Sequence, residues 1–277
     1  MAVTPDGDQR SGPICIRPRP RKVSRVVFIS QRRLRIRRNR ADPSVPWCSI
    51  MTGPGSTCWT MIEAAAAGGP AEREEFARRY DPAIRAYLAA RWRDSFRLGD
   101  LDDAAQEVFL ECLKQGGVLD RAERGRPGGF RAFLFGTVRN VARRLETRRL
   151  RAREQQPPAE GGLDGVAADE TSLSRVFDRA WARGLLREAA RRHEERAAAQ
   201  GEAARRRVEL LRLRFHEGLP IREVARRWGA EPAALHHEYA RARREFRAAL
   251  LETVAFHHPG TPTELEQECA NLLTLLD

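Results

Sequence analysis

The sequence predicts an all-α protein, with two helical domains joined by a flexible linker. Ala, Arg, Leu and Glu, all strong helix formers, dominate from Glu63 onward, and β-branched residues are sparse. Apolar residues in this part recur at the three-to-four spacing of amphipathic helices. A stretch rich in Pro and Gly, residues 154–172, interrupts that spacing and separates two helical blocks.

Charge is distributed unevenly along the 277 residues, whose net charge is +12. Residues 1–50 hold 12 Lys/Arg and 3 Asp/Glu, a net of +9, which leaves +3 for residues 51–277. The overall charge therefore says little about nucleic-acid binding, and only local clusters are informative.

Residues 1–55 form a basic arm, in which Pro13, Pro18, Pro20, Pro43 and Pro46 flank the arginine run from Arg32 to Arg40. This composition cannot bury enough apolar surface to fold alone, so we predict disorder. Two alternatives stay open. The arm could contact DNA phosphates without sequence preference, or translation could begin at Met51 or Met61.

The first predicted domain, residues 56–154, contains three helical patterns. Residues 72–93 form one helix or two short helices broken near Pro82, and residues 101–114 and 130–150 form the next two. The 101–114 helix is acidic and the 130–150 helix is rich in arginine. This contrast favours a module that holds a basic partner on one side and phosphates on the other.

Two runs in this domain carry a resemblance: Asp102-Asp103-Ala-Ala-Gln106-Glu107-Val-Phe-Leu and Phe130-Arg131-Ala-Phe-Leu-Phe-Gly-Thr-Val-Arg139-Asn140. They resemble region 2 of the bacterial RNA polymerase sigma-70 family, of the extracytoplasmic-function (ECF) type. The Ser-Thr-Cys-Trp run at 56–59 resembles the opening of a planctomycete-like subgroup.

The resemblance implies that the acidic helix docks on the β′ clamp of core polymerase. The docking residues would be Asp102, Asp103, Gln106 and Glu107. It also implies that the next helix and the loop before it, Leu119 to Gly129, capture the unwound −10 strand. A basic groove suits an exposed strand of phosphates and unstacked bases. The residues implied for the −10 strand are Arg131, Arg139, Asn140, Arg143, Arg144 and Arg148.

Two positions of this region leave questions open. Arg144 stands where many members of the family carry an acidic residue, so the −10 specificity is not defined. Phe135 fits the core and a DNA-facing surface equally well from its periodicity.

The linker is assigned to residues 155–174 and the second domain to residues 175–255. Helical periodicity covers 175–204, with a turn near Gly201, and then a helix that ends at Gly218. A short helix from Ile221 to Trp228 stops at Gly229, and Pro232 begins a longer basic helix. A short helix, a glycine turn and a longer basic helix make up a helix-turn-helix.

This segment resembles sigma region 4, which reads the −35 element and contacts the β flap of core polymerase. The apolar stripe of the second helix leaves a set of residues free for the major groove or the phosphates. They are Ala233, His236, His237, Ala240, Arg241, Arg243 and Arg244. Residues 256–277 form a tail with a short amphipathic helix that packs on the second domain or contacts a regulator.

No catalytic set, metal-ligand spacing or phosphate-binding loop is recognisable, so we expect no cofactor, no metal and no enzymatic activity. His257 and His258 precede Pro259 and are expected in a loop. The five scattered cysteines are expected to be reduced thiols in the cytoplasm, at the nucleoid, and no membrane insertion is expected.

The sequence therefore predicts a sigma factor whose partners are core RNA polymerase and promoter DNA. Whether an anti-sigma protein also binds the chain is left open. The alternative is a helix-turn-helix regulator that binds duplex DNA without core polymerase. That reading gives no role to the acidic helix or to the arginine-rich helix that follows it.

Overall fold

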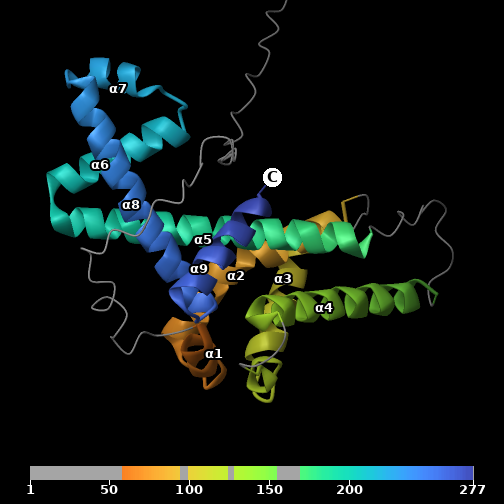
Figure 1. Cartoon of the computed structure of the whole chain (residues 1–277). Helices are drawn as coiled ribbons and strands as arrows, with labels where there is room; N and C mark the ends of the chain where they lie inside the picture. Colours follow the sequence, from red (N-terminus) through yellow and green to blue (C-terminus); the bar gives the residue numbers. More distant parts are fainter. Residues whose placement is uncertain (1–57, 94–98, 124–127, 155–168, 277) are drawn as a thin grey trace, which may run out of the picture.

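The computed structural model describes residues 58–93, 99–123, 128–154 and 169–276. Within these ranges the chain is helical and contains no strand, which confirms the all-α prediction (Figure 1). The N-terminal arm and most of the expected linker lie outside the described residues. The helices are α1 (Cys58–Ala66), α2 (Pro70–Arg91), α3 (Leu101–Leu113), a 3₁₀ turn η4 (Leu119–Arg121), α4 (Gly129–Glu154), α5 (Glu170–Gln200), α6 (Glu202–Phe215), α7 (Ile221–Trp228), α8 (Pro232–His257) and α9 (Pro262–Thr274).

Helix α2 is one continuous helix, although Pro82 lies inside it. A proline in a helix interior costs about 3 kcal/mol because it removes a hydrogen bond and crowds the preceding turn. The buried face of α2 offsets this cost, since Phe76, Tyr80, Ile84 and Tyr87 are each at most 2% exposed. The alternative of two short helices is therefore wrong.

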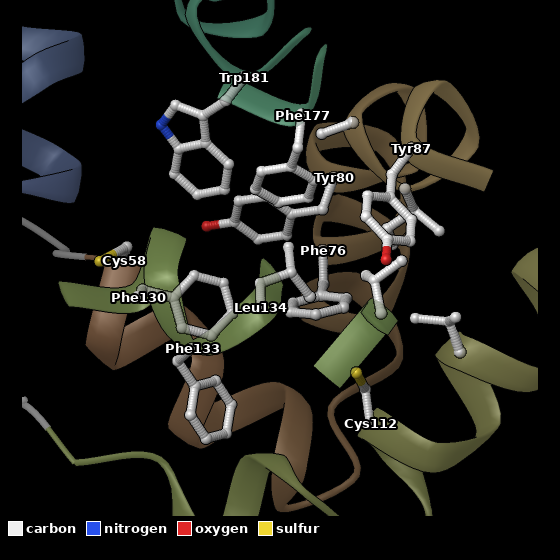
Figure 2. Close-up of a cluster of buried hydrophobic side chains, with 14 of the residues drawn as sticks. Cys58, Phe76, Tyr80, Tyr87, Cys112, Phe130, Phe133, Leu134, Phe177 and Trp181 are labelled. Carbon is white, nitrogen blue, oxygen red and sulfur yellow. The ribbon is translucent and has the colours of Figure 1, made fainter. Parts of the chain in front are cut away.

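An aromatic cluster fills the core between α2, α4 and α5. Figure 2 shows Tyr80 of α2 between Phe130 of α4 and the α5 side chains Phe177 and Trp181. The Tyr80 ring centroid lies 5.1 Å from that of Phe130 and 5.2 Å from that of Trp181. Buried aromatic pairs at such separations contribute beyond their buried area. Phe177 and Trp181, which follow the expected linker in the sequence, thus complete the core of the first helical block.

Helix α5 connects the two helical blocks and spans the molecule (Figure 1). The Asp169 carboxylate caps it by accepting a hydrogen bond from the Ser172 backbone N–H at 3.0 Å. Residues 170–174, which we assigned to the linker, are therefore helical. Helix α5 packs on α2, α6 and α8, and it ends at Gly201, whose φ of 95° suits glycine.

A second, smaller core lies between α6, α7 and the first turns of α8. Leu210, Val224 and Leu235 are its central side chains. Helix α7 has the bounds that the sequence predicts, and Gly229 ends it in the left-handed conformation with a φ of 58°. Helix α7, its glycine turn and the start of α8 thus pack around one small core with α6.

The C-terminal helix α9 belongs to the larger core. Thr261 and Glu264 form a capping box at its start. Its buried residues Leu265, Cys269 and Leu272 join the cluster that contains the aromatic side chains of α2 and α4. The tail thus packs on α8, most of which belongs to the expected second domain, and its buried residues also join the larger core. Among the described helices, none has the length and apolar character needed to cross a membrane.

Candidate nucleic-acid interface

Helix α3 presents a polar face to solvent. Ala104, Ala105 and Val108 point into the core, whereas Asp102, Asp103 and Gln106 are exposed. The Asp102 carboxylate pairs with Arg85 of α2. Asp103 and Gln106 have no hydrogen bond or ion pair within the described residues, so these two side chains are available to a partner.

Leu110 lies on the same exposed face and was not among the residues that the sequence predicted. It is 64% exposed, one of two large apolar side chains that the described structure leaves in solvent. Its spacing from Asp103 and Gln106, at i+7 and i+4, places all three on one stripe. An apolar residue on the polar stripe of an amphipathic helix was the signal that could have identified it.

Glu107 lies toward α4 rather than toward a partner. Its Oε1 lies 3.5 Å from Arg144 and 3.4 Å from Arg148, while Glu111 Oε2 lies 2.8 Å from Arg144. Part of the acidic helix therefore pairs with the arginine-rich helix that follows it. We expected the acidic helix to bind a basic partner and the arginine-rich helix to bind phosphates. Glu107, Arg144 and Arg148 instead pair with one another.

One side of α4, from Arg131 to Arg143, lies toward α5. Arg131 lies 3.6 Å from Asp178, and Arg143 lies 2.9 Å from Glu170. The Arg139 guanidinium lies 6.0 Å from the centre of the Phe135 ring, and its Nε is buried without a hydrogen bond. Asn140 is exposed. Carboxylates of α5 thus border the surface that the sequence assigned to the −10 strand.

Phe135 is half-buried, and its ring packs against the larger core. Its ring centroid lies 5.4 Å from that of Phe177 and 5.6 Å from that of Tyr87. Of the two alternatives that periodicity left open for Phe135, the structure favours packing in the protein over a DNA-facing surface.

Another side of α4 contacts α2, because Glu146 accepts hydrogen bonds from Arg91 and from the Trp92 indole.

The first turns of α8 present the predicted groove-facing set. Leu235 is buried in the small core with α6 and α7, and Ala242 is also buried, which fixes the rotation of α8. Six of the seven predicted residues are then exposed: Ala233, His236, His237, Ala240, Arg241 and Arg244. Arg243 is half-buried, with its guanidinium 5.8 Å from the centre of the Tyr239 ring.

A buried ion-pair cluster connects this helix to α6. Arg207 of α6, 5% exposed, lies 2.9 Å from Glu245 and 3.5 Å from Glu238, both on α8. Glu245 also pairs with Arg241 at 3.1 Å. Desolvation lowers the pKa of the neighbouring His193, although Glu245 opposes that shift. Arg207 was not predicted, because its role depends on how α6 meets α8.

A second ion-pair cluster joins α2 to α5. The Glu188 carboxylate lies 3.0 Å from Arg78 and 3.1 Å from Arg79, and 2.6 Å from Arg191 of its own helix. Desolvation alone would raise the pKa of Glu188, but the arginines lower it to about 2. This carboxylate is therefore ionised over the physiological range.

His257 was expected in a loop, and this is wrong. It is the last residue of α8, and its ring lies 5.3 Å from that of Trp181 and 6.0 Å from that of Tyr80. Desolvation, with a smaller effect of the Arg79 charge, lowers the pKa of His257 to about 3. The ring is thus neutral and acts as part of the packing between α2, α5 and α8.

Thiols and metal ligands do not form a site in the described ranges. Cys58, Cys112 and Cys269 are buried and form no disulfide within the described residues. Burial raises the pKa of Cys112 to about 12 and that of Cys269 to about 11, so neither is a reactive thiolate. No group of three or more His, Cys, Asp or Glu side chains within the part of the chain that the structure describes could hold a metal ion.

Comparisons with protein-family models, with curated proteins and with solved structures each give no match. The functional assignment therefore depends on the surfaces described above and on the residues that carry the resemblance.

Proposed function

We propose that this chain is a sigma-type promoter-specificity subunit, which binds core RNA polymerase and directs it to −10 and −35 promoter elements. The observation that carries the DNA-reading half of the proposal is the outward set on α8. The six residues assigned to the major groove from the sequence are all exposed in the first turns of α8, and Arg243, assigned to the phosphates, is half-buried. Helices placed in this way read base edges from their N-terminal turns.

The first helical block supports the polymerase-binding half of the proposal. Asp103, Gln106 and Leu110 form one exposed stripe on α3 with polar and apolar character. An exposed apolar side chain among polar neighbours is typical of a protein-binding surface. In the proposal this stripe contacts the β′ clamp, and Leu110 joins the residues named from the sequence.

Strand capture in the −10 region is assigned to α4. Asn140 is exposed, while Arg131 and Arg143 are paired with Asp178 and Glu170 of α5. Phosphates would replace these carboxylates as partners of the guanidinium groups. Because the two pairs are partly exposed ion pairs, each contributes only about 0–1 kcal/mol, and such an exchange is energetically accessible.

A pull-down of core RNA polymerase by the full chain tests the proposal. We expect stoichiometric binding that is weakened by changes on the α3 stripe. Specific duplex DNA binding without any association with polymerase would instead support the helix-turn-helix regulator. The helix-turn-helix geometry agrees with both candidates, whereas the exposed α3 stripe favours the sigma-type subunit.

A further inference from the structure

Helix α5 sorts its charged residues between two faces. Its carboxylates up to residue 188 are Glu170, Asp178 and Glu188, and they pair with arginines of α2 or α4. Glu194 and Glu195, further along the helix, are exposed. The outward face between residues 175 and 187 carries no carboxylate. It carries instead a series of arginines at i, i+4 spacing, which we call the arginine ridge: Arg175, Arg179, Arg183 and Arg187. Arg175 and Arg187 are exposed, whereas Arg179 and Arg183 are half-buried, and Arg179 donates a hydrogen bond to the Leu275 carbonyl at 3.3 Å.

Many exposed arginines on the described helices have carboxylate partners three or four residues away, such as Arg212 with Glu209 and Arg226 with Glu223. Arg183 and Arg187 have no hydrogen bond or ion pair within the described residues. The residues one turn before and after them are arginine, alanine, glycine or leucine, so no local carboxylate can reach them.

Like charges at i, i+4 destabilise a helix, and the ridge contains three such pairs in succession. A fourth follows, since Arg191 lies four residues beyond Arg187. Glu170, Asp178 and Glu188 do not relieve the repulsion, because they pair with arginines of α2 or α4. A ligand with closely spaced negative charges would relieve it at every position of the ridge.

Based on the proposed function, we propose that the arginine ridge binds the phosphate backbone of duplex DNA. Successive arginines rise by about 6 Å along α5, and the ridge extends over about 18 Å, at 1.5 Å per residue. A DNA strand offers one phosphate for about every 3.4 Å of rise, so the ridge can follow several phosphates. Arginine is also suited to phosphate because its fork donates two hydrogen bonds.

The composition of the outward face favours DNA over a protein surface. Between the arginines it presents mainly small apolar residues such as Val176, Ala180 and Ala190, and the larger Leu186 is half-buried beside α9. Stable protein interfaces have large apolar or aromatic anchors at their centre. The two exposed large apolar residues of the described structure, Leu110 and Leu150, are both on other helices.

The position of α5 adds a structural reason. Its first turns contact α4 through Glu170 and Asp178, and its last turns pack on α6 and α8 (Figure 1). The helix therefore links the two candidate DNA-reading surfaces. Its ridge would hold the duplex through charge alone, without reading its sequence.

The test uses the full chain with Arg183→Gln and Arg187→Gln combined, and a 40-base-pair duplex of random sequence as the probe. Fluorescence anisotropy gives the dissociation constant at salt concentrations from 50 to 200 mM. Loss of two phosphate contacts should reduce the slope of log K against log salt by about 1.8. The affinity of the unchanged chain should then fall by about 12-fold more over this range than that of the variant.

A matched control combines Arg205→Gln and Arg212→Gln on α6, two exposed arginines that have carboxylate partners. This control removes the same charge, and we expect its salt slope to stay close to that of the unchanged chain. A second variant, Ala190→Glu, keeps both ridge arginines but supplies Arg187 with a partner, and it should also reduce the slope. Helix content from circular dichroism checks folding in each case.

An unchanged slope in the Arg183→Gln and Arg187→Gln variant would overturn the proposal. An unchanged slope with lost binding to core polymerase would overturn it too, and would assign the ridge to a protein surface. The probe has no promoter sequence and the assay has no polymerase. The DNA-binding assay therefore tests the arginine ridge, whereas binding to core polymerase tests the proposed function, and the two can fail independently.

Discussion

The ring of Tyr80 on α2 stacks on that of Trp181 on α5, with centroids 5.2 Å apart and an interplanar angle of 16°. This contact joins a helix of the first block to the helix that continues into the second. His257 at the end of α8 lies against both rings. Three segments that are distant in the sequence thus share one packing unit.

Trp181→Ala should weaken both helical blocks. Removal of a buried tryptophan costs about 3–5 kcal/mol of unfolding free energy, through lost burial and a cavity. Because Trp181 contacts α2 and α8, amide hydrogen exchange should accelerate in both helices. The control Trp228→Ala, in the smaller core, should affect mainly α6–α8. Faster exchange confined to α5 in Trp181→Ala would contradict the shared packing unit.

Glu188 should make stability depend on acid pH. Its pKa is lowered from the ordinary value of 4.5 to about 2, so its contribution is present above pH 4.5 and is lost as the pH falls toward 2. The difference between these values corresponds to at most about 3 kcal/mol.

Urea unfolding of the Glu188→Gln variant at pH 7 and pH 3 measures this contribution. The variant should be less stable at pH 7, and the difference from the unchanged chain should shrink at pH 3. The exposed Glu74→Gln serves as its control on α2. An equal difference at both pH values would show that the carboxylate charge is not what joins α2 to α5.

Arg241→Ala should weaken recognition of the −35 element and leave polymerase binding unchanged. A direct contact with a base edge contributes about 1–3 kcal/mol, or about a 5- to 150-fold change in affinity for the preferred sequence. Footprinting of the polymerase complex on promoter DNA measures this loss. Since Glu245 keeps its contact with Arg207 in this variant, α8 should stay in place. Equal loss of polymerase binding would argue against the assigned role.

Asp103→Ala combined with Leu110→Ala should show the opposite pattern. Both side chains are exposed and support no internal contact of α3, so the fold should be unaffected while affinity for core polymerase falls. Truncation of interface residues at a contact centre often costs about 2 kcal/mol or more, which is at least about 30-fold in affinity. Surface plasmon resonance with immobilised core polymerase measures it, with Glu74→Ala as the control. Unchanged affinity would place the docking surface elsewhere.

Local patterns made the helices predictable. The apolar stripe of α7 ends at a glycine that adopts the left-handed conformation, so the bounds Ile221–Trp228 followed from the sequence alone. The exposed set on α8 followed in the same way, because Leu235 and Ala242 define its buried side. These features depend on spacing within one helix.

Contacts between helices were not predictable in this way. The continuity of α2 through Pro82 depends on a buried face that α4 and α5 provide. The pairing of Glu107 with Arg144 depends on how α3 meets α4, and the burial of His257 depends on Tyr80 and Trp181. Charge and periodicity along a chain do not specify which faces meet.

Reconstituted transcription tests the central claim most directly. The full chain is added to purified core polymerase on templates chosen from the sites that it occupies in chromatin mapping. We predict discrete run-off transcripts that depend on the added chain and that the Asp103→Ala and Leu110→Ala variant fails to produce. Specific binding of the chain to those templates, with no transcript and no association with core polymerase, would contradict a sigma-type function.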